Sequence, residues 1–305
     1  MVGAGRTLPT PGRGLGSNRR RCRRHIERRW TISTPASTLL LEADDPAPAI
    51  AENSGADSPY LLVCDHAGRA VPRRLGRLGL PDAAFEAHVA WDIGALDLAR
   101  RLAEALDACL IHQAYSRLVI DCNRAPGHPN SIVTVSDGWK VASNQGLGPG
   151  GALARRAAVF DPYHVRIAAE LDARRARGLE TLLVCIHSFT PRMGGLARPW
   201  DVGILHMGDS DVSNAVLALL RREPDLMVGD NEPYAMDGTD FTAPFHAHRR
   251  GLDAVEVEVR QDHLQSLAGL EAMARLFARV LPIARDPGGA GPVLKRGRAA
   301  GGGPS

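Results

Sequence analysis

The sequence predicts an α/β domain with a mixed, largely parallel sheet flanked by helices. Short apolar runs alternate with amphipathic stretches from residue 58 to residue 285, which is the pattern of strands joined by crossover helices. No Pro-rich or Gly-rich linker interrupts this region, so we expect one catalytic domain over 58–285. Hydrophobic residues make up 44% of the 305 residues and charged residues 23%, which excludes a wholly disordered, collagen-like or membrane-spanning chain.

Two periodicities locate the predicted elements. Short apolar runs bounded by polar or turn residues indicate strands, and apolar residues that recur every three to four positions indicate helices. In the first helix, Leu96, Ala99 and Leu102 recur in this way, so we expect that face to pack on the sheet. The predicted strands lie at 60–64, 108–112, 118–121, 181–186, 202–205 and 254–259. The predicted helices lie at 93–106, 151–177, 211–222 and 264–281.

Charge is distributed unevenly along the chain. The formal net charge of +3 combines a balance of +8 in residues 1–40, where nine arginines face one glutamate, with +2 in residues 286–305 and −7 in residues 41–285. Residues 1–57 are rich in Arg, Gly, Pro and Ser and lack periodicity, and the end of the chain is rich in Gly and Pro. We therefore expect a disordered leader over 1–57, a disordered tail over 286–305 and an acidic domain between them.

The Arg-rich leader suggests one alternative function. Such leaders occur in transit peptides and in arms that bind nucleic acid, so the chain could be a nucleic-acid-binding protein. However, Trp30 is the one aromatic residue among residues 1–40, and an acidic domain would repel phosphates. We therefore expect no nucleic-acid partner.

Cysteine usage and hydropathy bear on the location of the protein. The five cysteines are an odd number and form no Cys-x-x-Cys pair, so neither a disulfide framework nor a zinc site of that type is expected. Reduced thiols are typical of a cytoplasmic protein. No apolar stretch approaches the roughly 18–20 residues that a membrane helix needs, and none before Leu39 suits a signal peptide. We expect a cytoplasmic protein without a membrane partner; its oligomeric state is not predicted.

Metal-binding residue types follow two predicted strands. Asp65 and His66 come directly after the strand at 60–64, and His187 follows the run at 182–186. Because ligands of open α/β sheets bind at the carboxyl ends of the strands, we expect both histidines to face one site. A catalytic zinc needs three protein ligands and an open position. Asp92 is the candidate for the third ligand, although an aspartate just before a helix is also a common N-cap, and Asp65 competes for the same position.

Charged side chains surround two further segments. Arg117 precedes the run at 118–121, and Asn123 and Arg124 follow it; guanidinium groups bind carboxylates through paired hydrogen bonds, so they could hold an acidic substrate or form structural ion pairs. Strand alternation also places Glu256, Glu258 and Arg260 on one face of the strand at 254–259 and its continuation. A glutamate beside a metal could act as general base.

Other nucleophiles and histidines have simpler explanations. Ser210 lies in a Gly-Asp-Ser-Asp sequence typical of lipolytic serine hydrolases, which makes a serine esterase a second alternative, but Asp209 or Ser210 as an N-cap of the helix at 211–222 is the simpler account. Cys64 is a weakly supported nucleophile. His206 and His246 are each expected to be structural.

Taken together, these segments resemble the N-formylglutamate amidohydrolase family. The matching segments occur in the family's order: CDHAG at 64–68, HVAWDIGA at 88–95, SRLVIDCNRAP at 116–126, IHSFTP at 186–191, NEPY at 231–234 and EVRQD at 258–262. The resemblance extends more distantly to zinc carboxypeptidases and aspartoacylases. It implies hydrolysis of N-formyl-L-glutamate to formate and L-glutamate, a closing step of histidine degradation, with one Zn²⁺ per chain and a small N-acyl amino acid as the binding partner.

The resemblance also implies roles for individual residues. Two metal ligands would be His66 and His187. Glu258 would be the general base, Arg117 would assist catalysis and bind substrate, and further substrate contacts would come from Asn123, Arg124, Arg260 and His246. The carboxypeptidase-like relatives place a glutamate ligand three residues after the first histidine, where this chain has Arg69. The third ligand is therefore not carried over from them, and Asp92 is a choice made from this sequence.

Overall fold

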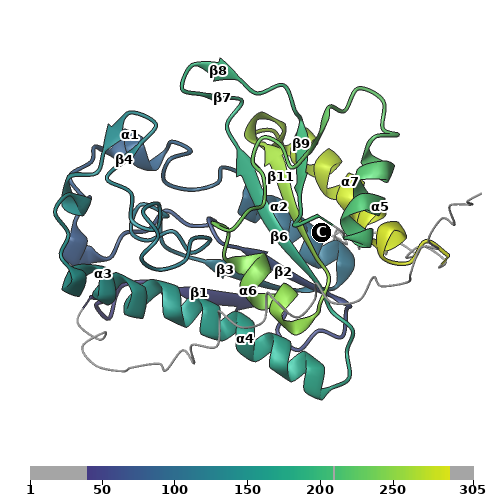
Figure 1. Ribbon diagram of the computed structural model, residues 1–305, viewed down its shortest axis with the longest axis horizontal. Helices are drawn as coiled ribbons and strands as arrows, with labels where there is room; N and C mark the ends of the chain where they lie inside the picture. Colours follow the sequence, from purple (N-terminus) through teal and green to yellow (C-terminus); the bar gives the residue numbers. More distant parts are fainter. Residues whose placement is uncertain (1–39, 209, 289–305) are drawn as a thin grey trace, which may run out of the picture. The chain divides into compact units, whose positions relative to one another are not determined.

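The computed structural model describes residues 40–208 and 210–288, and a seven-stranded sheet lies at its centre (Figure 1). The strands in spatial order are β1 (Ala49–Glu52), β3 (Cys109–Gln113), β2 (Tyr60–Cys64), β6 (Leu182–Phe189), β11 (Ala254–Arg260), β9 (Val202–Leu205) and β10 (Val228–Asp230). The four strands from β3 to β11 run parallel, as do β9 and β10. The pairs β1–β3 and β11–β9 are antiparallel. The predicted mixed, largely parallel sheet is confirmed.

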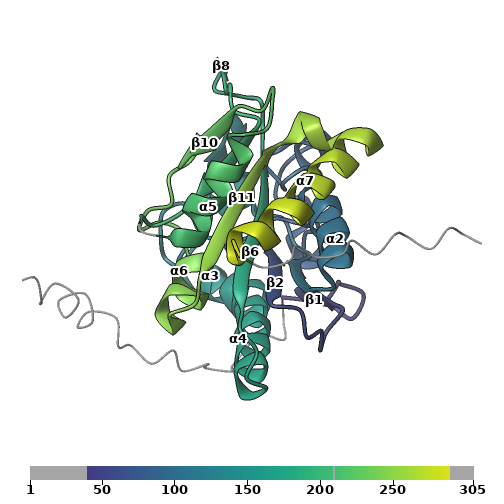
Figure 2. The same ribbon diagram turned by 90° about the vertical axis from the view of Figure 1, so that its right-hand side faces the viewer.

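Helices and loops bury both faces of the sheet. One face packs against α2 (Ala95–Leu106), α5 (Asp211–Leu220) and α7 (Leu267–Arg285), and α7 lies beside α2 (Figure 2). The other face packs against α4 (Asp161–Ala176), α6 (Thr242–His246) and the chain between β3 and α4. Strands that are buried on both faces carry nearly continuous apolar runs. For this reason β2, β3, β6 and β9 could be predicted as strands from the sequence.

The remaining elements are short. A π-helical turn at Arg156–Phe160 joins α3 (Pro149–Arg155) to α4, so the predicted helix at 151–177 is interrupted rather than continuous. The others are α1 (Asp82–Phe85), the hairpin of β4 (Val135–Ser136) and β5 (Trp139–Lys140), the hairpin of β7 (Arg192–Met193) and β8 (Leu196–Ala197), and 3₁₀ turns at Arg73–Leu75, Ala142–Asn144, His248–Arg250 and Gln261–Leu264. None of the helices in 40–208 or 210–288 is long and apolar enough to cross a membrane.

The predicted strand at 118–121 is wrong, because this run forms a buried turn. Leu118, Val119 and Ile120 are almost fully buried, which accounts for their apolar character. Their backbone bonds to side chains and loops instead of a neighbouring strand: the Leu118 carbonyl accepts from Asn144 and the Val119 carbonyl accepts from Arg155. Burial of any kind selects apolar residues, so the run alone did not identify a strand.

The predicted leader over 1–57 also needs correction. Residues 40–57 are described, and β1 at Ala49–Glu52 pairs with β3 along the edge of the sheet. Its four residues are all half-buried, so they carry neither the apolar run nor the alternation that marked the other strands. Residues 1–39 and 289–305, which hold most of the predicted leader and tail, lie outside the described residues, as does Asp209.

Candidate active site

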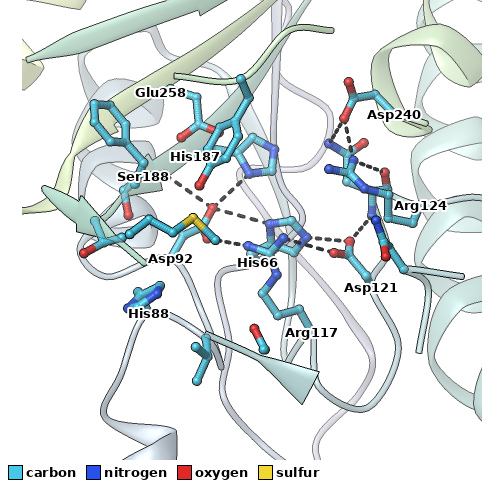
Figure 3. Close-up of a pocket in the computed structure, with 18 of the residues that line it drawn as sticks. His66, His88, Asp92, Arg117, Asp121, Arg124, His187, Ser188, Asp240 and Glu258 are labelled. Carbon is cyan, nitrogen blue, oxygen red and sulfur yellow. Dashed lines mark hydrogen bonds and ion pairs between the residues drawn. The ribbon is translucent and has the colours of Figure 1, made fainter. Parts of the chain in front are cut away.

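Polar side chains gather on one face of the sheet, at the carboxyl ends of β2, β6 and β11. Asp65 and His66 follow β2 directly, and His187 lies near the end of β6. Glu258 of β11 is the register partner of His187 on the neighbouring parallel strand, so both side chains project from the same face. Figure 3 shows His66, His187 and Glu258 converging on one pocket.

His66, Asp92 and His187 form a buried cluster that could hold a metal ion. Oδ2 of Asp92 lies 2.9 Å from Nδ1 of His187 and 3.4 Å from Nδ1 of His66. One ligand atom from each of the three residues lies within 4.8 Å of the others. Asp92 is held there because its backbone N–H donates to the His66 carbonyl at 2.9 Å.

Asp92 is therefore not the helix cap that the sequence left open. The N-cap of α2 is Gly94, which has a φ of 81° and no side-chain hydrogen bond. The Asp92 carboxylate instead accepts from the Ser188 backbone N–H at 3.3 Å and pairs with Arg117. Arg69, three residues after His66, pairs with Glu86, away from the cluster.

The second nitrogen of each histidine faces another carboxylate. Nε2 of His66 lies 2.7 Å from Oδ1 of Asp121, and Nε2 of His187 lies 3.3 Å from Oδ2 of Asp65. Such outer carboxylates fix the ring orientation of metal-binding histidines. Asp65, the competing candidate for the third ligand, thus lies on the far side of His187 and also accepts from Thr242 at 2.9 Å.

The donor set suits a zinc ion. Two imidazoles and one carboxylate are a common set for catalytic zinc, and all three residues are almost fully buried. Among the described residues, Nδ1 of His66 is a buried atom with no hydrogen-bond partner, as expected of a nitrogen that binds a metal. Within residues 40–208 and 210–288, no other group of three or more His, Cys, Asp or Glu side chains is arranged so that it could hold a metal ion.

The surroundings shift the pKa values of the acids in opposite directions. Burial opposes ionisation of Asp92, but His66, His187 and Arg117 together hold its pKa well below the usual range. Burial raises the pKa of Glu258 to about 8, with the Asp92 carboxylate adding to the effect. Two acids with divergent pKa values in one pocket are typical of a catalytic site.

The predicted substrate-binding residues Arg117, Asn123 and Arg124 all line the pocket, whose volume is about 250 Å³. Each also has a structural partner. Arg117 bridges Asp92 at 3.2 Å and Asp121 at 3.0 Å. The Asn123 side-chain oxygen accepts from two backbone N–H groups at the start of α6, and Arg124 pairs with Asp240.

Some residues of the pocket were not assigned from sequence. Asp121 was predicted only as the last residue of the strand at 118–121. Its position between Arg117 and Asn123 could have indicated that it belongs to the site. Asp240 belongs to none of the motifs. The remaining lining residues include His88, Ser188, Thr190, Leu205, Tyr234 and Glu256.

Two predicted substrate contacts are not brought to the pocket. Arg260 pairs with Asp201 and Asp262 and donates to the carbonyls of Pro199 and Trp200, because it lies at the end of β11, past the pocket. His246 is fully buried, where its Nε2 lies 2.9 Å from Nδ1 of His164.

The alternative nucleophiles lie outside the pocket as well. Ser210 caps α5, its hydroxyl accepting from the Ser213 N–H at 3.2 Å. Cys64 is fully buried, and burial raises the pKa of its thiol, which disfavours the reactive thiolate. His206 pairs with Asp230.

Comparisons with known proteins identify similar structures. The chain is 35% identical to the Agrobacterium tumefaciens gene product Atu2144, whose crystal structure superposes with a TM-score of 0.79 over 81% of this chain and 98% of that one. It is 17% identical to the N-formylglutamate amidohydrolase of Ralstonia eutropha JMP134, with a TM-score of 0.56 over 79% of this chain and 98% of that one, a likeness of fold. No curated protein matches the sequence.

The family assignment rests on a match that covers most of the domain. The family model described as N-formylglutamate amidohydrolase matches residues 58–264, the range that contains His66, Asp92, His187 and Glu258. Members of this family are hydrolases that act on amide C–N bonds. The chain therefore belongs to the N-formylglutamate amidohydrolase family.

Proposed function

We propose that this chain binds one Zn²⁺ through His66, Asp92 and His187 and hydrolyses N-formyl-L-glutamate to formate and L-glutamate. The observation that carries the proposal is the buried His66–Asp92–His187 cluster, in which Nδ1 of His66 has no hydrogen bond, in the same pocket as Glu258. A zinc ion bound there would supply Lewis-acid chemistry, polarising the formyl carbonyl and making a water molecule easier to deprotonate.

Side chains of the protein carry out the proton transfers and stabilise the developing charge. In its ionised form, Glu258 removes a proton from the attacking water while the water oxygen bonds to the formyl carbon. As the C–N bond breaks, Glu258 passes that proton to the departing nitrogen, which leaves as the amino group of glutamate. Arg117, whose side chain is 29% exposed, donates toward the carbonyl oxygen as negative charge develops there.

Arg124 anchors the α-carboxylate of the substrate. Its bonds to Asp240 and to the Asn123 carbonyl both use Nη1, so Nε and Nη2 are placed to form a paired contact with a carboxylate. This local contact matters because the acidic balance of residues 41–285 provides no long-range attraction for an anion. The predicted cytoplasmic location and place in histidine degradation stay predictions.

The test is a product-release assay on the purified chain. N-formyl, N-acetyl and N-succinyl forms of glutamate, aspartate and histidine are compared with and without a zinc chelator, and bound metal is measured by emission spectroscopy. We expect formate release to be fastest from N-formyl-L-glutamate, to stop on chelation and to return with Zn²⁺. Full activity in metal-free protein would refute the zinc assignment, and turnover of none of these compounds would refute the reaction.

A further inference from the structure

A second glutamate lies in the same pocket without a role in the mechanism above. Glu256 precedes Glu258 by two residues on β11, so both project from the same face. It is 2% exposed and lines the pocket. Its Oε2 is one of the buried side-chain atoms with no hydrogen-bond partner in the described part of the chain. A buried polar atom left unpaired is costly, which points to a partner supplied by a ligand.

The neighbours of Glu256 indicate how it would contact a ligand. Burial, the largest cause, raises the pKa of Glu256 to about 8. The carboxylates of Asp240, Glu258 and Asp65 act in the same direction, whereas His187 opposes them. A carboxyl group surrounded by other carboxylates keeps its proton and can donate a hydrogen bond.

The wall beside Glu256 is apolar. Leu205 of β9 is its register partner on the antiparallel side, and Leu205 also lines the pocket. Because directly opposed residues share a face, Leu205 and Glu256 lie side by side there. The pair offers apolar surface for methylene groups and, next to it, a hydrogen-bonding group.

We propose that Glu256 is a specificity-determining residue whose carboxyl group donates a hydrogen bond to the side-chain carboxylate of an N-formyl amino acid, with the side-chain methylenes along Leu205. This inference rests on the proposed function and deepens it, because Arg124 holds the α-carboxylate and leaves the side chain to be recognised. A pocket built to hydrogen-bond one group discriminates strongly against a substrate that lacks it.

The experiment compares two substrates that differ at the end of the side chain. N-formyl-L-glutamate carries the carboxylate, and N-formyl-L-norvaline replaces it with a methyl group. Glu256→Met keeps the side-chain length but removes the donor, whereas Glu256→Gln retains an N–H donor. The matched control is Glu170→Gln on α4, since Glu170 is also buried but pairs with Arg166 outside the pocket.

We expect Glu256→Met to lower kcat/KM for N-formyl-L-glutamate at least about tenfold, mainly through KM, because the buried hydrogen bond to a charged group is lost. Turnover of N-formyl-L-norvaline should change less than about threefold, since no hydrogen bond is lost there. Glu256→Gln should lose less than Glu256→Met on N-formyl-L-glutamate, because its amide N–H can still donate a hydrogen bond. Glu170→Gln should stay near wild type on both substrates.

Two results would overturn the inference. An equal loss on both substrates in Glu256→Met would assign Glu256 a structural or general catalytic role. Faster hydrolysis of N-formyl-L-glutamate by Glu256→Met would mean that an ionised Glu256 repels the substrate. Calorimetric binding of L-glutamate and L-norvaline makes the same comparison without turnover, so absence of deformylation would count against the proposed function alone.

Discussion

At the residue scale, the register between β6 and β11 determines which groups surround Glu258. It lies opposite His187 on the adjacent parallel strand, and its Oε2 is another of the described, buried atoms without a hydrogen-bond partner. A carboxyl in this position is near the candidate metal site but is not one of its three candidate ligands. It is therefore free to exchange protons with a substrate.

Replacement of Glu258 by Gln should remove catalysis and leave the site otherwise intact. We expect kcat for formate release to fall roughly 10²- to 10⁴-fold, the usual contribution of a general base. Zinc content and thermal melting should stay close to wild type, because the amide has the shape of the carboxyl and His66, Asp92 and His187 are unchanged. Formate release and metal analysis measure the two effects; a folded, zinc-loaded Glu258→Gln variant with wild-type turnover would remove Glu258 as the base.

Single residues were predictable from sequence where their position in an element was unambiguous. His66 and His187 follow buried apolar runs, so their place at the sheet edge could be predicted. Asp92 could not be assigned in the same way, because an aspartate before a helix serves equally well as a cap or a ligand. Its contacts with His187 and Arg117 depend on chain segments far apart in sequence.

At the element scale, the loop after β2 is positioned by close backbone contact. A Cβ atom on Gly68 would lie 2.0 Å from the Ala114 carbonyl oxygen. The same loop is joined to the chain after β3 by two backbone bonds, Ala70 N–H to the Ala114 carbonyl and Ser116 N–H to the Ala70 carbonyl. Gly68 thus permits the approach that brings His66 into the cluster.

Gly68→Ala should therefore weaken both the fold and the metal site. We expect the free energy of unfolding to fall by about 1–3 kcal/mol, as for other forced overpacking, and zinc affinity to fall because His66 lies two residues away on the same loop. Urea unfolding and zinc titration measure these effects. Gly148→Ala is the matched control, since a Cβ there would meet nothing within 4 Å; indistinguishable results for the two variants would contradict this account.

The run at 118–121, which was wrongly predicted as a strand, shows the limit of assigning secondary structure from local sequence patterns. Its residues are as apolar as those of β2, but the chain turns there and Arg155 and Asn144 bond to its backbone. Those partners come from α3 and a 3₁₀ turn that sequence periodicity did not link to this segment. Local pattern identifies burial, whereas the identity of the hydrogen-bond partner is a long-range property.

At the scale of the whole molecule, the fold class was predictable and the strand order was not. Alternating apolar and amphipathic segments imply a layered α/β domain wherever they occur. The insertion of β11, the last strand of the described residues, between β6 and β9 brings Glu258 beside His187. That placement depends on pairing between residues 51 to 71 positions apart, which no local pattern records.

Two buried histidines, His164 and His246, couple the stability of the whole domain to pH. His164 Nε2 lies 2.9 Å from the Cys122 carbonyl oxygen, so this nitrogen carries the proton. Its Nδ1 then accepts from Nε2 of His246, and the two rings stack. Protonation of His164 at Nδ1 would place its N–H opposite the Nε2–H of His246, so that the hydrogen bond between the rings would be lost. Burial lowers the pKa of His164 to about 4 and that of His246 well below 6.5.

The free energy of unfolding should therefore decline as the pH falls below about 6.5. In that range the histidines bind protons in the unfolded chain but not in the folded one. For His164, the free energy of unfolding at pH 5 should be about 2 kcal/mol lower than at pH 7.5, from the pKa difference between the two states. His164→Gln retains a donor for the Cys122 carbonyl and cannot titrate. It should be less stable at pH 7.5 but lose about 2 kcal/mol less on acidification, measured by urea unfolding at both pH values. Equal losses in wild type and variant would show that His164 is not responsible, since every other titrating group is common to both.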